Sequence, residues 1–254
     1  MEVIIKTGKN VAGAGKSIKR EIGGLLRKYS ARQTDDVARA NLAIIIGGDG
    51  TFLYWQSRLS CPVYGIKTGG VGYYMGASAD DFSGKLGEIL NGMNNGCQQS
   101  NLLARMVAEL NGRVFPLALN EYLISSGHVR QMFNCKLTVR GKETVERNSG
   151  IIVYTPTGSN AFASAAGAES LKINDRKMGI VALAPYSGRL KKKGIFFDKD
   201  EVKIECLNDF GEICVDGQKK YTYKIMAGDA VIIKKSVDNL KVVGILPGLP
   251  TKTS

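Results

Sequence analysis

The feature that most constrains the fold of this chain is a change in hydrophobic pattern near residues 91–96. Before this point, short apolar runs alternate with segments of helical spacing, which is typical of a parallel sheet covered by helices. After it, short runs with β-like alternation are separated by turn residues, which favours antiparallel strands. The sequence therefore predicts an α/β N-terminal domain with a parallel sheet and a β-rich, sandwich-like C-terminal domain. The predicted N-terminal elements are strands at 3–6, 42–46 and 62–66 and helices at 17–29 and 80–90.

The same pattern sets the predicted domain boundaries. The turn-rich sequence NGMNNG at 91–96 separates a domain of residues 1–96 from one of residues 97–240. An apolar run follows near the end of the chain, so residues 240–254 are expected to pack back on the first sheet. Within them, 247–250 (PGLP) is interpreted as a tail.

Two features stand out in the β-rich half. Asp216-Gly217 lies between two β-like runs and predicts a hairpin with a type I′ turn, because both residue types tolerate positive φ angles. The run NAFASAAGAESL at 160–171 predicts the one helix that interrupts the strands.

Charge and cysteine content limit the classes of partner. The chain has 35 Lys and Arg against 23 Asp and Glu, a net charge of +12, which favours anionic partners without choosing among them. The basic runs lack the interleaved aromatic residues of a nucleic-acid groove.

Five cysteines without a CxxC pair argue against a disulfide framework and a zinc site. No apolar stretch approaches roughly 18 residues. We expect a cytoplasmic protein that binds neither nucleic acid nor a membrane.

The segment GAGKS at 13–17 has the layout of a P-loop, with a strand before it and a helix after it. The P-loop pattern requires glycine where this chain has Asn10, and no predicted strand ends in a lone Asp that would hold magnesium. We interpret the segment as a helix start capped by Ser17, with a working P-loop as the minor alternative.

A second glycine-rich loop, GGDGT, follows a predicted parallel strand and opens a helix, where open α/β sheets bind ligands. Gly47, Gly48, Gly50 and Thr51 are predicted to bind phosphate or nucleotide through backbone N–H groups. Asp49 would repel phosphate, so we assign it a chemical role, which is either to orient a cation or to accept a proton from an attacking hydroxyl. The alternative is a glycine-rich turn with Asp49 as helix cap.

Two polar segments of the second half are further candidates. TPTGSN at 155–160 follows an apolar strand and precedes small residues that would let a ligand approach; a tightly packed, capped helix is the alternative. Asn120 offers a donor and an acceptor and Glu121 offers acceptors, which suits ribose hydroxyls and a base edge. Taken alone, two polar residues at a strand end more often have a structural role.

Taken in order, GGDGT at 47–51, GIKTGGVGYY at 65–74, NE at 120–121, TPTGSNAF at 155–162 and DGQ at 216–218 resemble the NAD kinases. GGDGT alone is shared with diacylglycerol and sphingosine kinases and phosphofructokinases, but five elements in order are specific. The resemblance covers most of the chain. It implies an active site between an α/β and a β-rich domain in a homodimer or homotetramer.

The resemblance also implies a reaction and residue roles. Asp49 matches the family's catalytic Asp near the 2′-hydroxyl of the adenosine ribose of NAD. The phosphoryl group would come from ATP or polyphosphate, with Mg²⁺ on the donor phosphates and no metal ligand from the protein, giving NADP. The implied NAD-binding residues are Tyr73, Asn120, Glu121, Thr157, Gly158, Asn160, Ala161 and Ser164.

Several positions depart from the family pattern. Asn160 and Phe162 replace the usual Thr and Tyr, Ala168 lies in AAGA where a Gly-Gly segment is usual, Tyr186 stands where His is common, and Ser149 stands where Asp is usual. These changes concern the nicotinamide end and the choice between NAD and NADH. They leave two other hypotheses open: a lipid or sugar kinase with the same loop, and a non-catalytic dinucleotide-binding regulatory protein.

Overall fold

The structure, a computed structural model, divides the chain into two compact units, each described by itself. The N-terminal unit holds residues up to Leu102 and a late strand near residue 240, and the C-terminal unit runs from Leu103 to Asn239. The predicted tail at 247–250 and Asn10 of the P-loop-like segment lie outside the described residues. The described residues are 1–8, 11, 13–70, 72–128, 130–191 and 194–244.

The N-terminal unit is built on a seven-stranded sheet with the order β2-β1-β3-β4-β19-β6, in which β5 pairs with β4. The pairs of β1 with β2 and β3, and of β4 with β3, β5 and β19, are all parallel. This confirms the predicted α/β class. The strands are β1 (Glu2–Thr7), β2 (Arg32–Gln33), β3 (Leu42–Gly47), β4 (Val63–Lys67), β5 (Ala77–Ser78), β6 (Ser100–Leu103) and β19 (Leu240–Val243).

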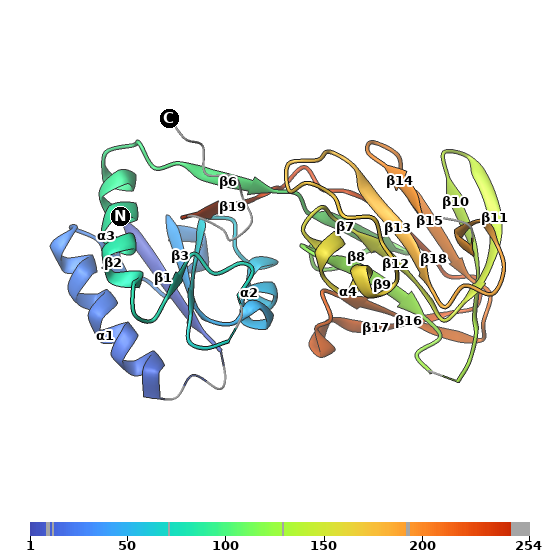
Figure 1. The fold of residues 1–254 in the computed structure, drawn as a ribbon, viewed down its shortest axis with the longest axis horizontal. Helices are drawn as coiled ribbons and strands as arrows, with labels where there is room; N and C mark the ends of the chain where they lie inside the picture. Colours follow the sequence, from blue (N-terminus) through green and yellow to red (C-terminus); the bar gives the residue numbers. More distant parts are fainter. Residues whose placement is uncertain (9–10, 12, 71, 129, 192–193, 245–254) are drawn as a thin grey trace. The chain divides into compact units, whose positions relative to one another are not determined.

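Helices cover both faces of this sheet. Figure 1 shows α1 (Gly13–Lys28) and α3 (Phe82–Asn94) on one face and α2 (Asp49–Gln56) on the other. A short 3₁₀ turn, η1, spans Val37–Arg39. The helical spacing explains the packing, because apolar residues of α1 and α3 fall on the face that meets the sheet. The buried core there includes Ile18, Ile22, Leu26, Leu86, Ile89 and Leu90, packed against Val3, Ile44, Ile46 and Ile66.

Two helix ends differ from the prediction. α1 begins at Gly13, so Ser17 lies inside the helix and the prediction that it caps the helix is wrong. α3 continues to Asn94, so most of the predicted turn-rich break is helical. Met93 packs against the core and extends the apolar face of α3, which explains the longer helix.

The C-terminal unit consists of two six-stranded sheets in which every strand pair is antiparallel, which confirms the predicted β-rich domain. The hydroxyl of Tyr122 in one sheet donates to the backbone oxygen of Met106 in the other at 3.3 Å. The first sheet has the order β11 (Lys142–Asn148), β10 (Phe133–Val139), β15 (Val202–Cys206), β18 (Ala230–Lys235), β7 (Met106–Leu110) and β8 (Arg113–Val114). The second has the order β14 (Ile195–Phe197), β13 (Met178–Leu183), β12 (Gly150–Tyr154), β9 (Glu121–Ser125), β16 (Phe210–Val215) and β17 (Thr222–Met226).

The predicted helix at 160–171 is wrong for most of its length. The chain forms a 3₁₀ turn, η2 (Gly158–Asn160), and one turn of helix, α4 (Phe162–Ala165). Gly167 then adopts φ +76°, a left-handed conformation that ends a helix and that glycine reaches without a steric penalty. The small residues gave a helix-like pattern, but the backbone reverses before a second turn can form.

The predicted hairpin joins β16 and β17, and Asp216 and Gly217 have φ angles of +49° and +62°. The Gln218 N–H donates to the oxygen of Val215 at 2.9 Å, which closes the turn. The loop is longer than two residues, however, because the 3₁₀ turn η4 (Lys219–Tyr221) precedes β17.

No helix in the described part of the chain has both the length and the apolar character needed to cross a membrane. All five cysteines are free, and Cys61, Cys135 and Cys206 are buried. Burial raises the pKa of the Cys61 thiol, which keeps it protonated near neutral pH. A further 3₁₀ turn, η3 (Arg189–Lys191), lies between β13 and β14.

Candidate active site

The glycine-rich loop connects the buried strand β3 to α2. β3 ends at Gly47, Gly48 is the N-cap of α2, and Asp49 is the first helical residue. Because β1, β3 and β4 are parallel and paired in register, their carboxyl ends lie at one edge of the sheet. That edge is where open α/β sheets bind ligands, so the loop occupies the predicted position.

The glycines of this loop differ in the space that is free around their Cα atoms. A Cβ atom added to Gly47 would lie 2.7 Å from Thr51 Oγ1, and one added to Gly8 would lie 2.6 Å from the same atom. Thr51 therefore packs between these two glycines. A Cβ on Gly48 would meet no described atom within 4 Å. Packing against Thr51 explains why residue 47 is a glycine, whereas the space beside Gly48 is open to a ligand.

The Asp49 carboxylate is fixed by a segment that follows β4. Its Oδ2 accepts a hydrogen bond from the Tyr73 N–H at 2.9 Å, and its Oδ1 accepts one from the Tyr74 N–H at 3.0 Å. Gly48, not Asp49, is the N-cap of α2, so the alternative in which Asp49 caps the helix is wrong. The carboxylate is half-buried and held in one orientation at the edge of the sheet.

Packing holds this second segment against α2 and β4. The Tyr74 ring is 2% exposed and stacks on Phe52 with ring centroids 5.0 Å apart. The Gly76 N–H donates to Gly65 O at 3.0 Å, and a Cβ on Gly65 would lie 2.8 Å from Tyr74 O. The backbone N–H groups that bind Asp49 are therefore positioned by an aromatic stack and by close backbone contact.

In the C-terminal unit, one carboxylate organises the start of β9. Asp216, 4% exposed, accepts the N–H of Asn120 at 2.7 Å, of Leu119 at 3.0 Å and of Glu121 at 3.1 Å. β9 begins at Glu121, so Asn120 lies just outside the regular strand. A buried carboxylate that binds three N–H groups strongly fixes the backbone of these residues.

The TPTGS turn packs directly on the same residues. Thr157 Oγ1 donates to Leu119 O at 2.8 Å, and the Thr155 N–H donates to Asn120 O at 2.9 Å. A Cβ on Gly158 would lie only 2.0 Å from Asn120 O, so only glycine allows this approach. The structure thus brings the predicted residues Asn120, Thr157 and Gly158 together.

Glu121 is 4% exposed, and its Oε2 has no hydrogen-bond partner among the described residues. Burial, and then the negative charge of Asp216, raises the pKa of Glu121 to about 8. Near neutral pH this carboxyl group is therefore mostly protonated and can donate as well as accept a hydrogen bond.

The remaining predicted contacts lie on η2 and α4. Asn160 and Ser164 are exposed and Ala161 is half-buried. Asn160 Oδ1 accepts a hydrogen bond from Ser170 Oγ at 2.9 Å, and Ser164 Oγ donates to Ala161 O at 2.6 Å. These three residues form an accessible stretch beyond the buried Thr157 and Gly158.

Five positions depart from the NAD kinase pattern. Asn160 belongs to this stretch and Phe162 and Ala168 lie close to it in the sequence, whereas Ser149 and Tyr186 lie on other segments. Phe162 and Tyr186 are 47% and 63% exposed, and the guanidinium of Arg147 lies over the Tyr186 ring at 5.2 Å. The Ser149 N–H donates to Leu183 O at 2.8 Å. Ala168 is half-buried.

Sequence reasoning missed the part played by Asp216, which it explained by the hairpin alone. Turn residues are usually exposed, so nothing local indicated a buried carboxylate. The signal that could have found it was the DGQ element at 216–218, because it is one of the five elements that carry the family resemblance.

Comparison with known proteins decides the family. The model of the ATP-NAD kinase N-terminal domain matches residues 8–93, and that of the ATP-NAD kinase C-terminal domain matches residues 119–245. The chain belongs to the NAD kinase family. An NAD kinase from Thermoplasma volcanium is 32% identical over 206 residues, which are 80% of this chain and 74% of the relative. NAD kinases are phosphotransferases.

Solved NAD kinase structures share the fold. A crystal structure of an NAD kinase from Archaeoglobus fulgidus in complex with ATP has a TM-score of 0.77 at 22% identity, covering 95% of this chain and 93% of that one. Yeast NADH kinase complexed with NADH has a TM-score of 0.83 at 16% identity, covering 96% and 83%. At these identities the likeness shows the NAD kinase fold and assigns no residue roles.

Proposed function

We propose that this protein transfers a phosphoryl group from ATP, or from inorganic polyphosphate, to the 2′-hydroxyl of the adenosine ribose of NAD, giving NADP. Membership of the NAD kinase family supports the reaction. The observation that carries the mechanism is the Asp49 carboxylate, held by the N–H groups of Tyr73 and Tyr74 beside the glycine-rich loop. That arrangement provides an oriented acceptor next to a phosphate-binding edge.

In this mechanism Asp49 accepts the proton of the attacking hydroxyl. Each carboxylate oxygen accepts one backbone N–H and keeps a lone pair for a further hydrogen bond. Because the orientation is fixed before substrate arrives, little reorganisation is needed at the moment of reaction. General-base catalysis of this kind is worth about 10²- to 10⁴-fold in rate.

The loop binds phosphate through its backbone. The start of α2 carries the partial positive charge of a helix N-terminus, which favours an anion. The Thr51 N–H donates to Gly48 O at 2.9 Å, so Thr51 supports the shape of the loop. Gly48 leaves room for phosphate to approach, whereas Thr51 and Gly47 hold the loop in shape. Gly50 and Tyr73 complete the nucleotide side of the proposed site.

The dinucleotide is bound by residues of the C-terminal unit. Asn120 and Glu121 recognise polar groups of NAD, with their backbone fixed by Asp216. The protonated Glu121 carboxyl donates to a ring nitrogen or accepts from a ribose hydroxyl. Asn160, Ala161 and Ser164 supply the accessible surface along which the rest of the dinucleotide lies, and Thr157 and Gly158 hold that surface on Asn120.

The divalent cation belongs to the donor. Among the described residues no group of three or more His, Cys, Asp or Glu side chains lies together. In the proposed mechanism, as the family resemblance implies, Mg²⁺ arrives on the donor phosphates as part of the substrate. There it neutralises phosphate charge during transfer.

Location and assembly are part of the same proposal. Five free cysteines suit the reducing cytoplasm. A homodimer or homotetramer is what the family resemblance implies. Sedimentation velocity would distinguish these states from a monomer.

The direct test is to incubate the purified protein with Mg²⁺, ATP or polyphosphate, and NAD, NADH, diacylglycerol or fructose 6-phosphate as acceptor. We expect a product phosphorylated at the 2′ position of the dinucleotide. Phosphorylation of the lipid or sugar instead would contradict the proposal. Calorimetry showing dinucleotide binding without product would contradict it too and would indicate a non-catalytic binding protein. The rates in the NAD and NADH arms give the preference of the protein between the two dinucleotides, which is the property that the changes at Ser149, Asn160, Phe162, Ala168 and Tyr186 concern.

A further inference from the structure

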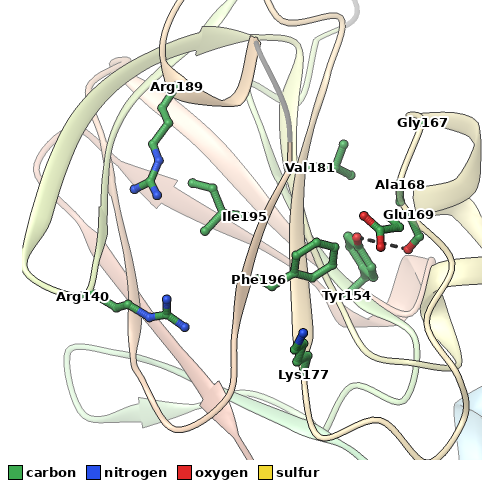
Figure 2. A pocket seen from close by; sticks show the side chains of 11 residues that line it. Arg140, Tyr154, Gly167, Ala168, Glu169, Lys177, Val181, Arg189, Ile195 and Phe196 are labelled. Carbon is green, nitrogen blue, oxygen red and sulfur yellow. Dashed lines mark hydrogen bonds between the residues drawn. The ribbon is translucent and has the colours of Figure 1, made fainter.

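The C-terminal unit contains a cavity that the proposed phosphoryl transfer does not use. Its volume is about 870 Å³, and Figure 2 shows its lining side chains. The strand register places Tyr154 and Phe196 on one face of their sheet and Ile195 on the other. Its charges are mixed as well, because the carboxylate of Glu169 lines it together with cations such as Arg189. The cavity therefore has no single chemical character that selects a ligand.

A more specific arrangement in the same unit is a pair of cysteines on adjacent strands. Cys135 on β10 lies directly opposite Cys206 on β15. Both are free thiols, and both residues are 0% exposed. Directly opposite residues of antiparallel strands project to the same face of the sheet. The two thiols therefore face the interior of the unit side by side.

The backbone hydrogen bonds around Cys206 show which kind of cross-strand pair this is. The Cys206 N–H donates to Asp229 O at 2.9 Å, on the side of β18 and away from β10. The N–H of the next residue, Leu207, donates instead to Asn134 O at 3.0 Å, on the side of β10. Cys135 and Cys206 therefore form a non-hydrogen-bonded pair, the closer of the two kinds, with Cα atoms typically about 4.5 Å apart.

That spacing suits a disulfide. A disulfide bridges Cα separations of about 4.4–6.8 Å, so the two sulfur atoms can be joined with little movement of either strand. Both strands lie inside the sheet, since β10 also pairs with β11 and β15 also pairs with β18. The backbone that presents the two thiols is therefore held on both sides.

We propose that Cys135 and Cys206 form an oxidation site that is converted to a disulfide by hydrogen peroxide. One thiol, as its thiolate, attacks a peroxide oxygen, which breaks the O–O bond, gives a sulfenic acid and releases one water. The other thiol then attacks the sulfenic sulfur, which forms the S–S bond and releases a second water. In total, two thiols are oxidised to one disulfide while one hydrogen peroxide is reduced to two waters.

Burial limits when this reaction proceeds. It raises the pKa of both thiols, and the negative charge of Glu146 raises that of Cys135 further. Thiolate is the reactive form and is scarce at neutral pH under these conditions, so the closed protein reacts slowly. The pair therefore stays reduced until its surroundings open.

The turn that follows β15 controls this opening. Cys206 is the last residue of β15, and Leu207 beside it is 41% exposed. Asn208 closes the turn, because its Oδ1 accepts the Asn134 N–H at 2.6 Å and its Nδ2 donates to Met132 O at 2.9 Å. Breaking these two hydrogen bonds uncovers Cys206, which is therefore the thiol that attacks the peroxide.

Peptide mapping of the parent protein tests the pair. The protein is treated with hydrogen peroxide, the remaining thiols are alkylated in denaturant, and the chain is digested without reduction. We expect a cross-linked peptide that contains Cys135 and Cys206 and that dithiothreitol separates. The exposed Cys97 serves as the internal measure of the oxidant dose. A disulfide between other cysteines, or free thiols at both positions after Cys97 is oxidised, would overturn the proposal.

The rate of cross-linking tests the role of the turn. Asn208→Ala removes both side-chain hydrogen bonds and should speed formation of the cross-link several-fold. Asn174→Ala, at an exposed turn position of the same unit, is the matched control and should react as the parent does. Urea below the unfolding transition should speed the reaction in the parent protein without any substitution. Equal rates in the two variants and in the presence of urea would contradict control by the turn.

The stability of the oxidised protein gives a further readout. A disulfide restricts the unfolded chain, so the midpoint of urea denaturation should be higher in the oxidised parent than in the reduced parent. The oxidant should give no such rise in Cys135→Ala. Cys61→Ala removes a buried cysteine of the N-terminal unit and is the matched control, which should gain stability as the parent does. An equal rise in Cys135→Ala and in Cys61→Ala would overturn the assignment of the pair.

Discussion

The carboxylate of Asp49 accepts the backbone N–H of Tyr73 at 2.9 Å, so the first residue of α2 is oriented by a segment beyond β4. The Tyr74 N–H holds the second oxygen at 3.0 Å. The position of the proposed base therefore depends on how this segment packs against Gly65 and Phe52. Damage to that packing should appear in turnover without any change to the base itself.

Gly65→Ala tests this dependence. The new Cβ would lie 2.8 Å from Tyr74 O and 2.6 Å from Met75 Sδ, and the backbone oxygen cannot move without shifting the N–H groups that hold Asp49. We expect kcat to fall about tenfold or more, with a loss of about 1–3 kcal/mol in the free energy of unfolding from overpacking. Steady-state kinetics and chemical denaturation measure the two effects.

Gly84→Ala is the control for that variant. Gly84 is exposed on α3, and a Cβ there would meet no described atom within 4 Å. Alanine should raise the free energy of unfolding by about 0.5–1 kcal/mol through helix propensity and leave kcat unchanged. Normal turnover in Gly65→Ala would show that the segment does not position Asp49.

Asp216→Asn tests the support of Asn120 and Glu121. The amide carries no charge, and its NH₂ group would replace the Oδ2 atom that accepts the Leu119 N–H, so the start of β9 loosens. We expect a loss of about 1–3 kcal/mol in the free energy of unfolding and a KM for NAD raised several-fold. Removing this negative neighbour should also lower the pKa of Glu121.

Asp229→Asn is the matched control, since Asp229 also lies in a turn of the C-terminal unit and accepts the Met226 N–H at 2.8 Å. It should cost less stability and leave the KM for NAD as it is. If the KM for NAD were the same in both variants, Asp216 would have no part in dinucleotide binding.

Glu121 gives the folded protein a defined pH dependence. Its pKa in the folded state is about 8, raised from an ordinary value near 4.5 by burial and by Asp216. Between these values the folded state binds more protons than the unfolded state, so the free energy of unfolding falls as pH rises from about 4.5 to about 8.

Glu121→Gln should remove that part of the slope. Urea denaturation at a series of pH values measures it, with Glu143→Gln, an exposed position on β11, as the control. We expect the Glu121→Gln variant to lose less stability between about pH 5 and about pH 8 than the control variant does. Identical slopes would mean that Glu121 is ionised at neutral pH in the folded protein.

The N-terminal sheet could be predicted from the sequence because its central strand β3 is buried on both faces and an amphipathic helix, α1, lies between β1 and β3 in the chain. The run LAII at 42–45 is apolar throughout, and Ile18 and Ile22 recur at helical spacing. The antiparallel half was harder, since β9 and β13 were not recognised as strands. β13 (Met178–Leu183) is an apolar run buried on both faces, and such runs can be read as helix or strand.

The candidate site was predictable as a set of loops but not as a set of contacts. Glycine patterns indicated where a ligand approaches, and the family resemblance joined the loops into one hypothesis. The hydrogen bonds from Tyr73 to Asp49 and from Asn120 to Asp216 span long stretches of sequence, and no local pattern encodes such pairs. The helix expected after TPTGS failed because a small-residue run resembles a helix until Gly167 reverses the backbone.

The turnover of Asp49→Asn tests the central claim most directly. The variant keeps the size of the side chain and removes its basicity, and Asp35→Asn, exposed in the same unit, serves as the control. We predict that NADP formation from NAD falls by about 10²- to 10⁴-fold while the Kd for NAD, measured by calorimetry, changes only a few-fold. Turnover equal to that of the control variant would contradict the assignment of Asp49 as the group that accepts the hydroxyl proton.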